Sequence, residues 1–189
     1  GDGVWAAAAL AVALALWLLV FFRDPAREGP RGVHLVIAPA DGKVVSLVEA
    51  DEPTYLRAAA RRVSIFMNVF DVHVNRYPVA GTIEFVRYHP GRFLHAGGDK
   101  ASLDNEQASV GIRTAHGPVL VRQIAGLVAR RIVTDGRPGD RAVQGERMGM
   151  IRFGSRLDVF VPLAARPVAR VAPGDRVQAG VTVLLELPE

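Results

Sequence analysis

The chain begins with one long apolar segment, after which its hydrophobic pattern changes completely. Residues 4–22 form an uninterrupted apolar run, which as an α-helix would be about 28 Å long and would match the hydrocarbon core of a bilayer. From residue 33 onward, apolar residues occur in short alternating segments separated by Gly, Pro and Asp, a pattern typical of β-strands joined by tight turns. The pattern predicts an anchor helix over residues 1–24, a linker over 25–32 and a β domain over 33–189.

Two other interpretations of the apolar run remain open, a secretory signal and the core helix of a large protein. The run has no basic segment before it and no small-residue cleavage site after it, which disfavours a signal. A helix that is apolar all round needs lipid or a large protein interior around it. Arg23, Arg27 and Arg31 follow the run, and the positive-inside tendency then places the β domain on the cytoplasmic side of a cell membrane.

The β domain is expected to contain few helices. Strands are expected over residues 33–38, 43–48, 63–69, 81–88, 109–114 and 118–124. Helical character is confined to residues 53–62 and 124–134. The sequence therefore predicts a mainly β fold with a few short helices and an N-terminal transmembrane helix.

Two pairs of segments within the β domain repeat one another. PADGKV (residues 39–44) matches PVAGTI (78–83), and GDRAVQG (139–145) matches GDRVQAG (174–180). This order is similar to the barrel-sandwich hybrid of biotinyl and lipoyl domains, in which glycines occupy turn positions with positive φ. We therefore expect a compact β-sandwich or barrel built from two related, barrel-sandwich-hybrid-like halves.

Charge and cysteine content narrow the possible partners. The net charge is +4 with Arg as the main base, which suits an anionic partner such as a phosphate headgroup or a membrane surface. Cysteine is absent, which excludes disulfides and thiolate metal sites, and no second group of ligands supports a metal site of another kind. No basic run with interleaved aromatic residues occurs, so nucleic acid is not an expected partner.

The most unusual feature of the apolar pattern is Gly154-Ser155, which interrupts a strand-like segment over residues 151–162. A serine hydroxyl can attack the carbonyl of the residue before it, and Gly at that position leaves the carbonyl unshielded. Elimination across the serine then breaks the chain and leaves a dehydroalanine, which hydrolyses to a pyruvoyl group. The alternative is an ordinary strand with a Gly kink.

A second unusual segment is DVHVNRYP (residues 71–78), in which polar residues alternate with apolar ones. In an extended segment Asp71, His73, Asn75 and Tyr77 share one face, and His is the side chain best suited to moving protons near neutral pH. Either His73 is a catalytic base, or this is a solvated strand face.

Asp41 and the loop over residues 91–106 supply further candidates. Asp41 lies in an Asp-Gly turn, where it serves either turn chemistry or the orientation of a His base. The loop is polar and Gly-rich, contains His95 and Lys100, and is longer than a simple connection requires. Its Gly-Gly-Asp-Lys order lacks the spacing of a phosphate-binding P-loop.

Taken together, these motifs resemble the phosphatidylserine decarboxylase family, in its short bacterial and archaeal type. The matching segments are the apolar anchor with FRDP (22–25), PADGKV (39–44), DVHVNRYP (71–78), DKAS (99–102) with Asn105-Glu106, and FGSR (153–156). The resemblance implies self-cleavage between Gly154 and Ser155 into a β chain ending at Gly154 and an α chain beginning at Ser155. Ser155 becomes a covalent pyruvoyl group, and neither metal nor pyridoxal phosphate takes part.

The same resemblance implies the reaction, decarboxylation of phosphatidylserine to phosphatidylethanolamine and CO2. The pyruvoyl group forms a Schiff base with the substrate amine, His73 acts as base with Asp41 as its orienter, and Arg76, Lys100 and His95 are candidates for binding the substrate. Longer members of the family have His-x-x-His where this chain has His73 and Arg76. The implied partners are the bilayer and the cleaved α and β chains as a heterodimer, and a homo-oligomer is left open.

Three rival functions share some of these features. A membrane-anchored barrel-sandwich adaptor would need a coiled-coil hairpin between its halves, and no heptad run occurs. A lipoyl or biotinyl carrier would need a lysine at the tip of a tight hairpin, which is absent. A serine hydrolase would need a G-x-S-x-G elbow, whereas Ser155 has Gly on one side only.

Overall fold

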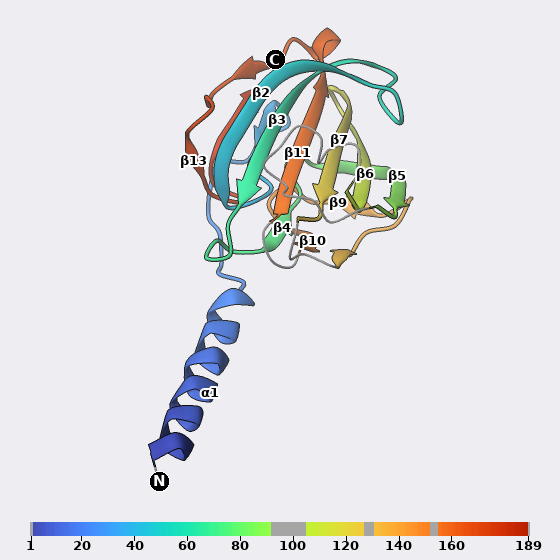
Figure 1. Cartoon of the computed structure of the whole chain (residues 1–189). Coiled ribbons are helices and arrows are strands. Elements are labelled where there is room, and N and C mark those ends of the chain that lie inside the picture. The colour runs from blue at the N-terminus through green and yellow to red at the C-terminus, as the bar shows by residue number, and fades with distance from the viewer. Residues whose placement is uncertain (1, 92–104, 127–130, 152–154, 189) are drawn as a thin grey trace.

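The computed structural model describes residues 2–91, 105–126, 131–151 and 155–188 (Figure 1). Its described part contains one α-helix, α1 (Asp2–Phe21), which projects from a β domain, and one 3-10 turn, η1 (Leu163–Ala165). The strands are β1 (Leu35–Ile37), β2 (Gly42–Glu52), β3 (Ala58–Met67), β4 (Val74–Arg76), β5 (Gly81–His89), β6 (Gln107–Thr114), β7 (Gly117–Ile124), β8 (Ile132–Thr134), β9 (Arg141–Ala142), β10 (Arg147–Ile151), β11 (Ser155–Pro162), β12 (Val168–Ala169), β13 (Arg176–Val177) and β14 (Val183–Glu186). The predicted mainly β class with an apolar N-terminal helix is confirmed.

Helix α1 stands apart from the β domain, as Figure 1 shows. Its segment Gly3–Phe21 is long and apolar enough to cross a bilayer, and its apolar side chains from Val4 to Leu16 are largely exposed. That exposure excludes a core helix of this domain, so the remaining way to bury these side chains is in lipid or in a further protein.

Most strands join one curled antiparallel sheet. Its eight strands are in the order β13-β2-β3-β11-β7-β6-β5-β9, and two three-stranded sheets, β1-β14-β12 and β4-β10-β8, accompany it. Strand β11 lies at the centre, paired along its length with β3 on one side and with β7 on the other. Ser155 therefore begins a strand that is paired on both sides within the sheet.

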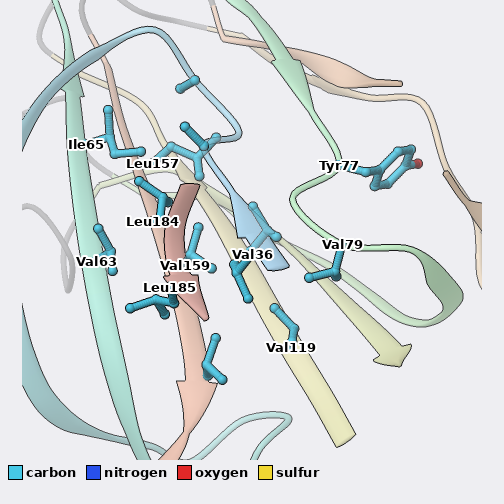
Figure 2. Close-up of a cluster of buried hydrophobic side chains, with 14 of the residues drawn as sticks. Val36, Val63, Ile65, Tyr77, Val79, Val119, Leu157, Val159, Leu184 and Leu185 are labelled. Carbon is cyan, nitrogen blue, oxygen red and sulfur yellow. The ribbon is translucent and has the colours of Figure 1, made fainter. Parts of the chain in front are cut away.

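The core lies on one face of the curled sheet. Figure 2 shows Val63 and Ile65 of β3 and Leu157 and Val159 of β11 near the side chains of β14. Because side chains alternate along a strand, these odd-numbered residues face the core while their even-numbered neighbours face the opposite side of the sheet. Ser155 has the core-facing parity of Leu157.

The internal repeat is confirmed by matching hydrogen bonds in the two halves. The amide of Gly139 donates to the carbonyl of Ile83, and the amide of Gly174 donates to the carbonyl of Val44, each at 2.8 Å. The strands that follow, β9 and β13, pair with β5 and β2 at opposite edges of the sheet in the same register. Gly139 and Gly174 have φ of +97° and +105°, a backbone conformation that favours glycine.

The prediction of a helix over residues 53–62 is wrong, because this segment forms a turn and the first part of β3. The buried carboxylate of Glu52 accepts hydrogen bonds from the amides of Tyr55 (2.8 Å) and Leu56 (2.9 Å), which closes a turn, and the chain then enters β3 at Ala58. The prediction of a second helix over residues 124–134 is also wrong at both ends of that range. Ile124 is the last residue of β7, and Ile132 is the first residue of β8. Residues 127–130 lie outside the described part of the chain.

The predicted linker runs as an extended strap across the β domain. Arg27 pairs with Asp41 at 2.7 Å, and Arg31 donates to the carbonyl of Gly180 at 2.7 Å. At Gly29 an added Cβ would lie 2.5 Å from the Gly180 oxygen, so only glycine fits this close approach. The strap holds the exit of α1 at a defined place on the domain.

Candidate active site

Ser155 is completely buried at the first position of β11. It lies opposite Met67, the last residue of β3, and its hydroxyl donates to the thioether sulfur of Met67 at 3.3 Å. A thioether is a weak acceptor, so the hydroxyl loses little energy if it leaves the sulfur for a stronger hydrogen-bond acceptor. Gly154, on the other side of the predicted cleavage site, lies outside the described residues.

His73 is also completely buried, in the segment that precedes β4. Its Nδ1 lies 2.8 Å from the backbone oxygen of Asp71, and because a carbonyl oxygen can only accept, Nδ1 must carry the hydrogen. In the neutral ring Nε2 then carries the lone pair, and this buried atom has no hydrogen-bond partner among the described residues. The arrangement gives His73 the tautomer that a base at Nε2 requires.

The pKa of His73 is lowered from its ordinary value, chiefly because burial disfavours the charged ring. The carbonyl and carboxylate of Asp71 and the carboxylate of Asp41 oppose this shift, and the charge of Arg23 adds to it. Near neutral pH the ring is therefore uncharged and able to accept a proton.

His73 lies next to Ile151, the last residue of β10. The amide of Ile151 donates to the carbonyl of His73 at 3.4 Å, and Gly149 lies opposite Asn75 in the β10–β4 pairing. Figure 1 shows β4 and β10 below the ends of β3 and β11, on the side where α1 joins the domain. His73 and Ser155 thus lie at the same end of the sheet.

A chain of polar side chains, buried except for the half-buried Thr134, ends at the same sulfur atom. Thr134 donates to the Oε1 of Gln123 at 3.0 Å, Gln123 donates to the Oδ1 of Asn75 at 2.8 Å, and the Nδ2 of Asn75 lies 3.7 Å from the sulfur of Met67. The amide of Asn75 and the hydroxyl of Ser155 therefore contact the same sulfur atom. Met67, Gln123 and Thr134 were not identified from the sequence, although Gln123 interrupts an apolar strand and could have been noticed for that reason.

Asp41 lies in the turn before β2 with both carboxylate oxygens bound. Oδ2 pairs with Arg27 at 2.7 Å, and Oδ1 accepts from the amide of Ala179 at 2.8 Å. The carbonyl of Asp71 occupies the position on His73 that was expected for Asp41. The part expected of Asp41 in maturation stays a prediction.

The three candidates for binding the substrate are not brought together in the described structure. Arg76 pairs with Asp24 and donates to the carbonyls of Pro25 (2.9 Å) and Gly145 (3.1 Å), so its guanidinium fastens the strap to the domain. His95 and Lys100 lie outside the described residues. Their roles stay predictions.

A cavity of about 370 Å³ opens on the other face of the sheet. Its lining includes Arg62, Arg122 and Phe160, and Phe160 has the parity opposite to that of Ser155 along β11. This cavity is therefore separate from the end of the sheet at which Ser155 and His73 lie.

Comparison with known proteins gives a consistent result. Residues 14–185 match the family model described as phosphatidylserine decarboxylase. Proteins named phosphatidylserine decarboxylase proenzyme are similar to this chain in Ralstonia nicotianae (48% identical, covering 97% of this chain and 87% of the relative), Symbiobacterium thermophilum (49%, covering 98% and 86%) and Ralstonia pickettii (47%, covering 92% and 80%).

Proposed function

Because the chain belongs to the phosphatidylserine decarboxylase family, we propose that it cleaves itself between Gly154 and Ser155 and then converts phosphatidylserine into phosphatidylethanolamine and CO2. The observation that carries the proposal is the buried hydroxyl of Ser155 at the start of the central strand, bonded only weakly to sulfur. Buried His73, with a lone pair at Nε2, lies at the same end of the sheet.

Maturation requires only groups of this chain and water. The Ser155 hydroxyl attacks the carbonyl carbon of Gly154, and the new C–O bond replaces the peptide C–N bond, whose nitrogen takes up a proton. A base removes the Cα proton of residue 155 and the Cβ–O bond breaks, which leaves the Gly154 carboxylate and a dehydroalanine. Water then converts the dehydroalanine into a pyruvoyl group and ammonia. We assign the first proton transfer, from the hydroxyl, to Nε2 of His73.

The pyruvoyl group, once formed, supplies a carbonyl that the substrate amine can attack and an acceptor for the electrons left when CO2 departs. Residues of this chain do the rest. Nε2 of His73 takes up the proton that the substrate ammonium releases when its nitrogen attacks, and then delivers it to the carbon that lost CO2, while Asn75 donates from Nδ2 toward this position. Both side chains are buried, which excludes water from the transfer. Candidates for holding the phosphodiester are Lys100 and His95.

The two cleaved chains are expected to remain together as a heterodimer. The α chain would begin at Ser155 and supply β11, which is paired on both sides with strands of the β chain. With α1 in the membrane, Arg23, Arg27 and Arg31 support a β domain on the cytoplasmic side, by the positive-inside tendency.

The deciding experiment compares the wild-type chain with Ser155→Ala by intact-protein mass spectrometry before and after borohydride reduction. We expect the wild type to give two chains that divide after Gly154, with a small chain that lacks a free amino terminus and gains two hydrogens on reduction. Ser155→Ala should stay one chain without decarboxylase activity. Ser109→Ala, which alters another buried strand serine, is the matched control and should mature. A cleaved, active Ser155→Ala protein would overturn the proposal.

A further inference from the structure

We propose that Phe21, the last residue of α1, forms one wall of the reaction site by covering His73, so that the membrane anchor is part of the site and not only a tether. Phe21 is in this view a positioning residue that acts through the imidazole ring. The inference rests on the proposed role of His73 in maturation and decarboxylation.

Phe21 is buried on a helix whose other described side chains are exposed, apart from the half-buried Trp17. The Phe21 side chain is 1% exposed, whereas the neighbouring Val20 and Phe22 are 54% and 42% exposed. The Phe21 ring lies on the His73 ring with a centroid distance of 4.2 Å and an interplanar angle of 32°. Trp17, one turn earlier, packs on the same phenyl ring at 5.4 Å.

Two contacts made by residues that follow Phe21 fix the end of the helix in this place. Arg23 donates to the carbonyl of Phe70 at 3.1 Å, which ties the helix end to the loop that precedes His73. Asp24 pairs with Arg76 of β4, which ties it to the strand that follows His73. The helix therefore meets the domain through the two segments that flank His73. These contacts hold the Phe21 ring in position against the imidazole ring.

The consequence is a dry environment for one face of the imidazole. An apolar ring at van der Waals distance excludes water there and disfavours the charged form, in keeping with the lowered pKa of His73. The charged groups that act on His73 are Asp71 on its own segment, Arg23 on the helix exit and Asp41 in the turn before β2. None of these three charges would be changed by truncating Phe21.

The test titrates the His73 ring by NMR in the full-length, uncleaved Ser155→Ala protein in lipid nanodiscs, with and without Phe21→Ala. We expect Phe21→Ala to move the titration upward, toward the ordinary value of about 6.5. In the Ser155 protein the same variant should slow maturation more at pH 6 than at pH 8, because a larger fraction of His73 is then protonated. Leu19→Ala is the control, since it truncates an apolar side chain of the same helix that is 72% exposed, and it should leave both readouts at wild-type values.

Identical titration in Phe21→Ala and Leu19→Ala would overturn the inference. If Phe21→Ala does not fold, the contact is tested without it, by a nuclear Overhauser effect between the Phe21 and His73 rings in the Ser155→Ala protein, whose absence would also overturn it. The titration does not depend on turnover. A chain that never cleaves would therefore refute the proposed function while the titration still decided the role of Phe21.

Discussion

Ser155 and Asn75 share one weak partner, the sulfur of Met67. Buried donors normally have strong acceptors, because leaving one unsatisfied costs about 1–3 kcal/mol. A sulfur satisfies them only partly, so the hydroxyl and the amide can both turn to an oxygen of the reacting group at little cost. The bond from Gln123 to the Oδ1 of Asn75 leaves Nδ2 as the atom that faces the site.

We predict that Asn75→Ala slows maturation by about 10²–10³-fold, the usual effect of losing one positioned donor to a developing negative charge. Thr134→Val removes only the far end of the polar chain and should have a much smaller effect. The measurement is the rate at which the α chain appears after synthesis, followed on denaturing gels. Maturation of Asn75→Ala at the wild-type rate would remove Asn75 from the mechanism.

At the scale of the element, β11 must stay in place after its own first peptide bond is cut. Arg156, directly after Ser155, is buried and forms two bonds with Asp158, at 2.7 and 3.1 Å, and one with the hydroxyl of Ser64 at 2.9 Å. These contacts lie on the face of the sheet opposite Ser155. They hold the new chain end in register, so that a group formed from Ser155 would keep its position.

Arg156→Met is expected to lower the free energy of unfolding by about 3–5 kcal/mol, because it leaves the carboxylate of Asp158 buried without its partner. The double variant Arg156→Met/Asp158→Leu should recover most of that loss, because no unpaired charge remains. Urea denaturation in detergent, with every variant in the uncleaved Ser155→Ala background, measures both. A loss of less than about 0.5 kcal/mol in the single variant, as for an exposed residue, would show that the pair does not anchor β11.

The apolar pattern was enough to predict the long strands β2, β5, β6, β7 and β11 and part of β3, whereas the shorter strands β8, β9, β10, β12, β13 and β14 were not predicted. The helix expected over residues 53–62 failed because its Ala and Arg residues have high helix propensity, whereas pairing with β2 and β11 on both sides favours the strand. The site was predicted in part for a similar reason. Ser155 and His73 break the apolar pattern and are visible in it, but Met67 and Phe21 look like core and anchor residues until the fold brings them to Ser155 and His73.

At the scale of the whole molecule, the anchor and the site lie at the same end (Figure 1). Phe70, in the loop after β3, is 73% exposed, and its carbonyl binds Arg23 directly after α1. With α1 across a bilayer, this ring would lie at the level of the lipid headgroups, where aromatic side chains are favoured. Seating the loop in the interface would bring the end of the sheet that holds Ser155 against the leaflet that carries the substrate.

Phe70→Asp should therefore raise the KM for phosphatidylserine in vesicles by about tenfold, which corresponds to about 1.4 kcal/mol of lost interfacial burial. It should leave turnover of a short-chain, monomeric phosphatidylserine unchanged, because that substrate reaches the site from water. Val168→Asp changes another exposed apolar residue, in the strand that follows the far end of β11, and should affect neither substrate. If Phe70→Asp slowed both substrates equally, the loop would act on His73 through its fold and not on the membrane, and the site would not need to rest on the bilayer.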